Sequence, residues 1–117
     1  MKPIIFILVM VSVVSVMPWV TLNAAEPALV SEVPLAFVKQ HCSACHNEAH
    51  SEGDFRADLL GKDLADPSNH KAWSRVLARV QSGEMPPPKE TERPPETEIA
   101  ATLVSLKTAF HAEALAQ

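Results

Sequence analysis

The two cysteines of this 117-residue chain lie three positions apart, and a histidine directly follows the second one: Cys42-Ser43-Ala44-Cys45-His46. Three kinds of site use this pattern: a redox-active dithiol, a zinc site and a covalent attachment point for haem c. In a haem site, the two intervening residues let both sulfurs bond to the vinyl groups on one edge of the porphyrin. The histidine then lies under the ring, where its imidazole can ligate the iron.

The surrounding sequence separates these three hypotheses. A thioredoxin-like dithiol belongs at a strand-to-helix junction, and no segment shows the alternation of a strand. A zinc site would combine Cys42 and Cys45 with two of the nearby histidines, His41, His46 and His50. Zinc sites normally place a longer spacer between the thiol pair and the histidine pair, and adjacent Cys45 and His46 would ligate one ion awkwardly. Haem attachment is therefore the favoured interpretation, with the other two as alternatives.

A haem iron has a second axial position, and the methionine count suggests which residue fills it. Three of the four methionines fall within the first 17 residues, and Met85 is the remaining one. Met85 lies in Gly-Glu-Met-Pro-Pro-Pro, 39 residues after His46. A proline-stiffened loop is a poor place for a core side chain and a suitable one for holding a thioether over a haem. The rival ligands, which would give bis-histidine coordination, are His50, His70 and His111.

The elements around these residues are predicted to be helical. Residues 35–42 have apolar side chains at helical spacing, residues 55–61 suggest one or two helical turns, and residues 70–82 form a clear amphipathic helix. Ser68 or Asn69 is a plausible N-cap for that helix, and Gly83 is a good C-terminal stop. Five prolines in residues 84–95 exclude helix and central strand. A last helix is expected from about Pro95 or Glu96, with an apolar stripe through Ile99, Leu103, Leu106 and Phe110.

The first 25 residues resemble a secretory signal. Lys2 precedes an uncharged stretch with an apolar run at residues 4–17 and small residues at Ala24 and Ala25. An uncleaved membrane anchor is the alternative, because the stretch approaches the roughly 20 residues that span a bilayer. We therefore expect an exported, periplasmic protein with a signal peptide or anchor at 1–25, a linker at 26–33, a domain at 34–113 and a tail at 114–117.

The composition of residues 26–117 indicates a small domain that needs a cofactor. These 92 residues carry nine basic and fourteen acidic side chains, a net charge of −5, which argues against nucleic-acid binding. They contain no tyrosine and a single tryptophan, Trp73. Small domains with so few large apolar side chains usually rely on disulfides, a metal or a cofactor, and a disulfide between Cys42 and Cys45 would close only a tiny loop.

Four segments together resemble the planctomycete-type cytochrome c domain, a branch of the class I cytochromes c. They are HCSACHN, GDFRADL, HKAWSRVLARVQSGEMPPP and RPPETEIAATL, which extend from about Phe37 to Phe110. The block from Trp73 to Pro87 is the most specific part. EGDFRADL has one glycine where the family often has two.

This resemblance implies a small all-α class I cytochrome c fold with three to five helices around one covalently bound haem, and a long Pro-rich loop before the last helix. Cys42 and Cys45 would be the thioether anchors, His46 the proximal iron ligand and Met85 the distal one. Trp73 would form part of the haem-pocket wall. Its indole N–H would donate to a haem propionate, or the side chain would simply pack in the core. Arg56, Arg75 and Arg79 are candidate propionate partners, although a solvated face is the better interpretation for at least two of them.

The predicted function is outer-sphere electron transfer, by a carrier rather than an enzyme. Its partners would be redox proteins, and it could be a partner or subunit of a periplasmic oxidoreductase. The cytochrome c maturation machinery would be a further partner. One alternative is a haem c protein in which Met85 dissociates, so that the iron senses a small ligand or acts on peroxide. The other is a thiol or zinc protein without haem. A membrane would be involved only through a retained leader.

Overall fold

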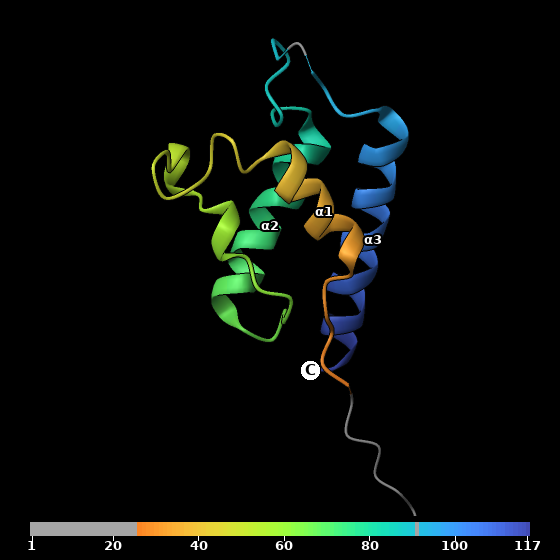
Figure 1. Cartoon of the computed structure of the whole chain (residues 1–117). Helices are drawn as coiled ribbons and strands as arrows, with labels where there is room; N and C mark the ends of the chain where they lie inside the picture. Colours follow the sequence, from red (N-terminus) through yellow and green to blue (C-terminus); the bar gives the residue numbers. More distant parts are fainter. Residues whose placement is uncertain (1–25, 91) are drawn as a thin grey trace, which may run out of the picture.

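The computed structural model describes residues 26–90 and 92–117, and their secondary structure is helical (Figure 1). Three α-helices are joined by loops that contain two short 3-10 helices: α1 (Glu32–His41), η1 (Glu52–Asp54), η2 (Ala57–Leu59), α2 (Pro67–Ser82) and α3 (Glu96–Leu115). These described residues form no β-strand, only two isolated bridges. The prediction of an all-α domain with three to five helices is confirmed, and the arrangement is compatible with a small cytochrome c fold.

Helix α1 begins three residues earlier than the apolar spacing indicated. Ser31 is extended, and the helix starts at Glu32. Pro34 lies in the first helical turn, where its missing N–H costs no intrahelical hydrogen bond, and it is buried. Glu32 is charged, and both Glu32 and Val33 are exposed, so the first turn lies off the apolar stripe that the prediction followed.

Helix α2 is capped by a different residue from the two expected. The carboxylate of Asp66, rather than Ser68 or Asn69, accepts hydrogen bonds from the backbone N–H groups of those same two residues. Pro67 then occupies the first helical position, where its fixed φ suits the helix. The predicted stop is confirmed, because Gly83 adopts the left-handed conformation with φ 78°.

The core lies where α1 and α2 both pack against α3. Its largest fully buried side chains are Trp73, Phe37, Leu64 and Leu106. The remaining buried apolar residues are Val30, Val38, Ala57, Val76, Val80, Ile99 and Ala109. Thr102 is also fully buried, and its Oγ1 has no hydrogen-bond partner within the described residues.

The segment before α1 contacts the loop that precedes α2. The Val30 N–H donates to the Lys62 carbonyl (2.8 Å), and the Leu64 N–H donates to the Ala28 carbonyl (3.2 Å). Val30 is 1 % exposed, so the end of the predicted linker packs onto the domain. The predicted signal or anchor at residues 1–25 lies outside the described residues. Among the helices that are described, none has the length and apolar character needed to cross a bilayer.

Candidate functional site

The cysteine motif continues the end of α1 as one tight turn. Cys42 is the C-cap, and its N–H donates to the Val38 carbonyl (2.9 Å). The Cys42 carbonyl then accepts from the N–H groups of both Cys45 (3.3 Å) and His46 (3.0 Å). Residues three and four positions apart in such a turn share one side. The turn therefore places both thiols and the histidine within five consecutive residues, as attachment and ligation of one haem require.

The environment of the thiols disfavours a redox-active dithiol. Cys42 is half-buried and Cys45 is exposed. Burial, with a further contribution from charge repulsion by Cys45, raises the pKa of Cys42 to about 11. Reactive dithiols work through a thiolate whose pKa is lowered. At neutral pH Cys42 is therefore protonated and poorly suited to thiol–disulfide exchange.

The nearby acidic and histidine side chains do not gather around the thiols. In residues 26–90 and 92–117, no group of three or more His, Cys, Asp or Glu side chains is arranged to hold a metal ion. His41 instead points to Glu98 on α3, with its Nε2 3.0 Å from the carboxylate. His50 is exposed. The zinc hypothesis therefore gains no support from the geometry.

The His46 ring is held so that one nitrogen remains available to a metal. Its Nδ1 lies 2.9 Å from the backbone carbonyl oxygen of Glu52. Because a carbonyl only accepts, Nδ1 carries the proton, and Nε2 keeps the lone pair that ligates iron. The Phe55 ring packs edge-on against the imidazole, with centroids 5.2 Å apart. The imidazole thus has a fixed tautomer and a packed face.

Asn47, which the sequence analysis did not single out, closes the motif turn. Its side-chain amide donates to the carbonyls of Ser43 (2.8 Å) and Ala44 (3.2 Å). Its side-chain oxygen accepts from the backbone N–H groups of Ala49 and His50. An asparagine directly after the motif histidine is a signal for such a turn, because its side chain readily bonds nearby backbone.

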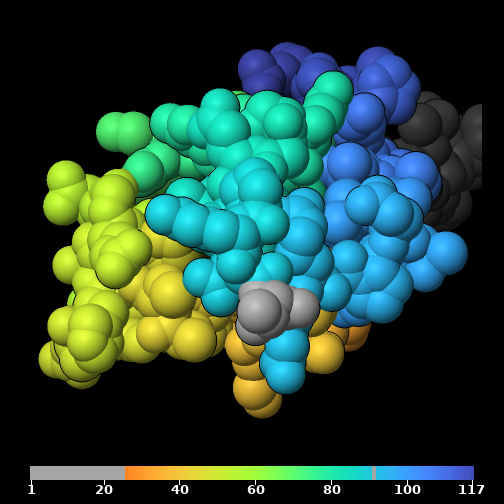
Figure 2. Space-filling view, turned by 90° about the horizontal axis from the view of Figure 1, so that it is seen from above, coloured from red at the N-terminus to blue at the C-terminus, as the bar shows by residue number. Residues whose placement is uncertain are grey.

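Met85 lies on a separate segment that packs beside the motif. Figures 1 and 2 both place the Pro-rich loop next to the end of α1. The Met85 N–H donates to the Arg79 carbonyl (3.1 Å), and its side chain is exposed. The following residue, Pro86, is buried, and its carbonyl accepts from Arg93 Nη1 (2.7 Å). The backbone at Met85 is therefore fixed on both sides while its thioether remains accessible.

Trp73 is 0 % exposed, and its indole N–H donates to the Gly61 carbonyl (2.8 Å). This bond uses the donor that was predicted to reach a propionate, and the role of Trp73 in a haem pocket stays a prediction. Each of the three candidate arginines also has a partner within the protein. Arg56 pairs with Asp58 (2.6 Å), Arg79 with Glu84, and Arg75 with backbone carbonyls of η1.

The remaining rival ligands lie on other surfaces. His111 is exposed near the end of α3. His70, in the first turns of α2, packs edge-on against Phe110 with ring centroids 5.0 Å apart. The ring nitrogens of these two residues make no hydrogen bond to a described backbone carbonyl, unlike His46 Nδ1.

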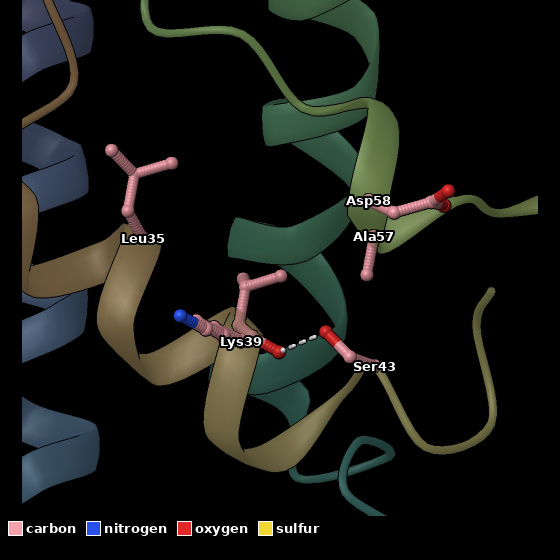
Figure 3. Close-up of a pocket in the computed structure, with 6 residues that line it drawn as sticks. Leu35, Lys39, Ser43, Ala57 and Asp58 are labelled. Carbon is pink, nitrogen blue, oxygen red and sulfur yellow. Dashed lines mark hydrogen bonds between the residues drawn. The ribbon is translucent and has the colours of Figure 1, made fainter.

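A pocket of about 570 Å³ opens between α1 and η2 (Figure 3). It is lined by Leu35, Val38, Lys39, Ser43, Ala57 and Asp58. The Ser43 hydroxyl at its edge donates to the Val38 carbonyl (3.3 Å). Neither cysteine lines the pocket, nor does His46 or Met85. The pocket therefore adjoins the motif at Ser43 but is not lined by the predicted haem ligands.

Comparison with known families agrees with this geometry. Residues 42–89 match the family model described as Planctomycete cytochrome C. This match supports a planctomycete-type cytochrome c domain in that part of the chain. The matched range begins at the first cysteine, includes all of α2 and extends past Met85. No curated protein and no solved structure matches the chain.

Haem c is the cofactor that this family implies, and the residues present fit it. Two free thiols share one turn with His46, and the Nδ1 bond of His46 leaves its Nε2 for iron. Partly buried apolar side chains, including Cys42 and Phe55, pack on the core, and a haem could cover the part of their surface that is still exposed. The residues and the family match together support a haem c protein of the cytochrome c type.

Proposed function

We propose that this protein is an exported, periplasmic electron carrier that holds one covalently attached haem c with His46 and Met85 as axial ligands. The observation that carries the proposal is the bond from His46 Nδ1 to the Glu52 carbonyl, 2.9 Å long, in the same turn as two free thiols. A bond from the second ring nitrogen to a carbonyl orients a ligating imidazole and raises its basicity.

The proposed roles of the chain's residues follow from their chemistry. When bound, haem c supplies an iron that alternates between ferric and ferrous states. Cys42 and Cys45 anchor the group, and His46 offers Nε2 as the proximal ligand. The Met85 thioether favours ferrous iron and raises the reduction potential relative to bis-histidine ligation. With both axial positions filled there is no open site for a substrate, so electron transfer is outer-sphere.

The proposed partners are redox proteins of the same compartment, such as an oxidoreductase that this carrier serves as partner or subunit. The cytochrome c maturation machinery would attach the haem after export. The net charge of −5 in residues 26–117 favours a basic docking face on the redox partner. Any attachment to the membrane would come from the leader.

Replacing Met85 by alanine tests the axial assignment. We expect the Met85→Ala variant to keep its covalent haem, to lose the iron–sulfur charge-transfer band of the ferric protein and to have a lower reduction potential. His70→Ala, which removes a rival ligand, serves as the matched control and should leave the band and the potential unchanged. A ferric spectrum that Met85→Ala leaves unaltered would refute Met85 as the ligand.

A second candidate function rests on the flexibility of the Met85 side chain, since the prolines fix its backbone but leave the thioether free to rotate. If the thioether dissociates, the iron would bind a small ligand or peroxide. Rapid carbon monoxide binding to the reduced unmodified protein would favour this sensor or peroxidase-like role. A colourless exported product, made in cells with a working maturation system, would instead return the site to the thiol or zinc hypothesis.

A further inference from the structure

Arg75 of α2 contacts the loop that holds the proximal histidine. Its Nη2 donates to the Gly53 carbonyl (2.6 Å), and its Nη1 makes a longer contact with the Asp54 carbonyl (3.4 Å). The guanidinium carbon also lies 5.7 Å from the centroid of the Phe55 ring, within range of a cation–π contact. One side chain from α2 therefore touches three consecutive residues of the loop.

These three residues directly follow the one that bonds the His46 ring. Glu52 supplies the carbonyl that accepts from Nδ1, and Phe55 supplies the ring that packs on the imidazole. Arg75 holds the carbonyls of the two residues between them. Both contacts that fix the imidazole thus belong to a segment that Arg75 holds against α2.

The backbone of this segment needs an external partner. Gly53 has φ 64° and Asp54 has φ 53°, so two consecutive residues adopt the left-handed conformation, which is unfavourable for aspartate. All three residues of η1 are exposed, and the carbonyls of Gly53 and Asp54 both accept from Arg75. A planar guanidinium with several fixed donors can bind two such carbonyls at once, which a lysine ammonium cannot do with the same geometry.

We propose that Arg75 is a positioning residue for the proximal ligand: it fixes the η1 loop so that the Glu52 carbonyl keeps its bond to His46 Nδ1. The inference rests on the proposed function, since it assigns the bond a role in haem ligation. Arg75 itself contacts neither His46 nor the iron; it acts through the backbone of Gly53 and Asp54. Its position in α2, between Trp73 and Val76 of the core, gives this support a rigid base.

The direction of the change in reduction potential distinguishes a positioning role of Arg75 from an effect of its positive charge alone. A strong bond to Nδ1 increases electron donation by the imidazole and stabilises ferric iron, so weakening the bond raises the reduction potential. Removing a positive charge near the haem has the opposite effect, because it stabilises ferric iron and lowers the potential. Arg75→Lys keeps the positive charge but disrupts the paired contacts to the two carbonyls. It therefore measures the positioning effect separately from the effect of charge.

The experiment measures the reduction potential and the solvent exchange of the His46 Nδ1 proton, by ¹⁵N NMR of the ferrous holoprotein. For Arg75→Lys we expect roughly a threefold rise in the ratio of reduced to oxidised protein at a fixed ambient potential, and faster proton exchange. Arg75→Ala should also exchange faster, with a smaller rise in potential because it loses the charge. Lys71→Ala, one turn earlier on α2 and also exposed, is the matched charge control and should change neither exchange nor ligation.

Gly53→Ala is a second variant that leaves α2 untouched. An added Cβ there has room, since its nearest contact would be Arg75 Nη2 at 4.0 Å, but the φ of 64° is strained for alanine. It should therefore shift the loop and raise the potential as Arg75→Lys does. If both variants retain covalent haem with unaltered potential and unaltered Nδ1 exchange, the positioning role is wrong.

The two proposals fail in different ways. A wild-type protein without an iron–sulfur charge-transfer band overturns Met85 as the distal ligand. The Nδ1 exchange of His46 still reports on Arg75 in that case, because it concerns the proximal side alone. A wild-type protein that carries no haem overturns both proposals.

Discussion

The loops that carry the two proposed iron ligands are held in place by different means. The His46 side is fixed by side chains that bond backbone carbonyls: His46 to Glu52, Asn47 to Ser43 and Arg75 to Gly53. The Met85 side relies more on its own backbone, with one side-chain bond, from Arg93 to the Pro86 carbonyl. Three consecutive prolines follow Met85, and a backbone bond ties its N–H to α2. The methionine side chain itself remains exposed.

This difference suggests how firmly each ligand is held. A ring with a committed nitrogen and a packed face has lost its freedom before any metal binds, so His46 is preorganised. Prolines restrict the Met85 backbone by fixing φ, but they leave the flexible thioether free to rotate. If one ligand dissociates during function, the structure indicates that it is Met85.

Helix α2 links the two sides. Arg75 reaches the His46 loop with its side chain, and Arg79, one turn later, accepts the Met85 N–H at its carbonyl. The same helix therefore supports both loops, by a side-chain contact on one side and a backbone contact on the other. Variants of each loop and of the helix itself test whether the two supports are independent.

The largest effect is expected from removing the preorganised ligand. His46→Ala should reduce the yield of haem-containing protein by about tenfold or more, because losing even a hydrogen-bond partner of a metal ligand typically costs 10- to 100-fold in metal affinity. The visible spectrum of the remaining haem should be high-spin. His50→Ala removes an exposed histidine from the same loop and should match the wild type. A low-spin spectrum retained in His46→Ala would contradict the proximal assignment.

An intermediate effect is expected from loosening the Met85 side. Arg93 donates to the Pro86 carbonyl (2.7 Å), so Arg93→Ala should free the loop and let the thioether dissociate more often. A hydrogen bond worth about 1 kcal/mol corresponds to roughly fivefold faster carbon monoxide binding to the reduced protein. Stopped-flow absorbance measures this rate, with Lys89→Ala in the same loop as the control. Equal rates in wild type and Arg93→Ala would show that the loop needs no such clamp.

The smallest effect on the haem is expected from replacing Asp66, the N-cap residue of α2. Hydrogen bonds from the Ser68 hydroxyl and from the backbone N–H groups of Ser68 and Asn69 lower the pKa of Asp66. Because the folded-state pKa is lowered, the stabilisation is present above the unfolded value of about 3.9 and is lost as the pH falls through the folded one. Asp66→Ala should therefore melt at a lower temperature than wild type at pH 7, and this gap should close in acid.

Asp66→Asn keeps a capping side chain that does not titrate, and should melt close to wild type at pH 7. Thermal melts followed by circular dichroism provide the measurement, and the haem spectrum should be unchanged in both variants. A changed iron–sulfur band in Asp66→Ala would mean that α2 transmits fraying at its start to the Met85 loop. The two loops would then not be independently supported.

Much of this domain was predictable because its signals are local. The Cys42-to-His46 spacing, the apolar periodicity of α2 and the left-handed stop at Gly83 each depend on residues within a few positions of one another. Errors occurred where two local signals competed. Ser68 and Asn69 are common N-caps, but Pro67 suits the first helical position, and this moved the cap to Asp66.

The sequence by itself determined the helical class, the turn that brings two thiols and a histidine together, and the methionine in a loop that cannot become helix. It could not determine the role of Arg75, which depends on two left-handed residues more than 20 positions away. It also did not reveal that Trp73 donates its indole N–H to Gly61. Contacts between distant segments depend on how α1 and α2 pack against α3, and periodicity within one segment carries no information about that packing.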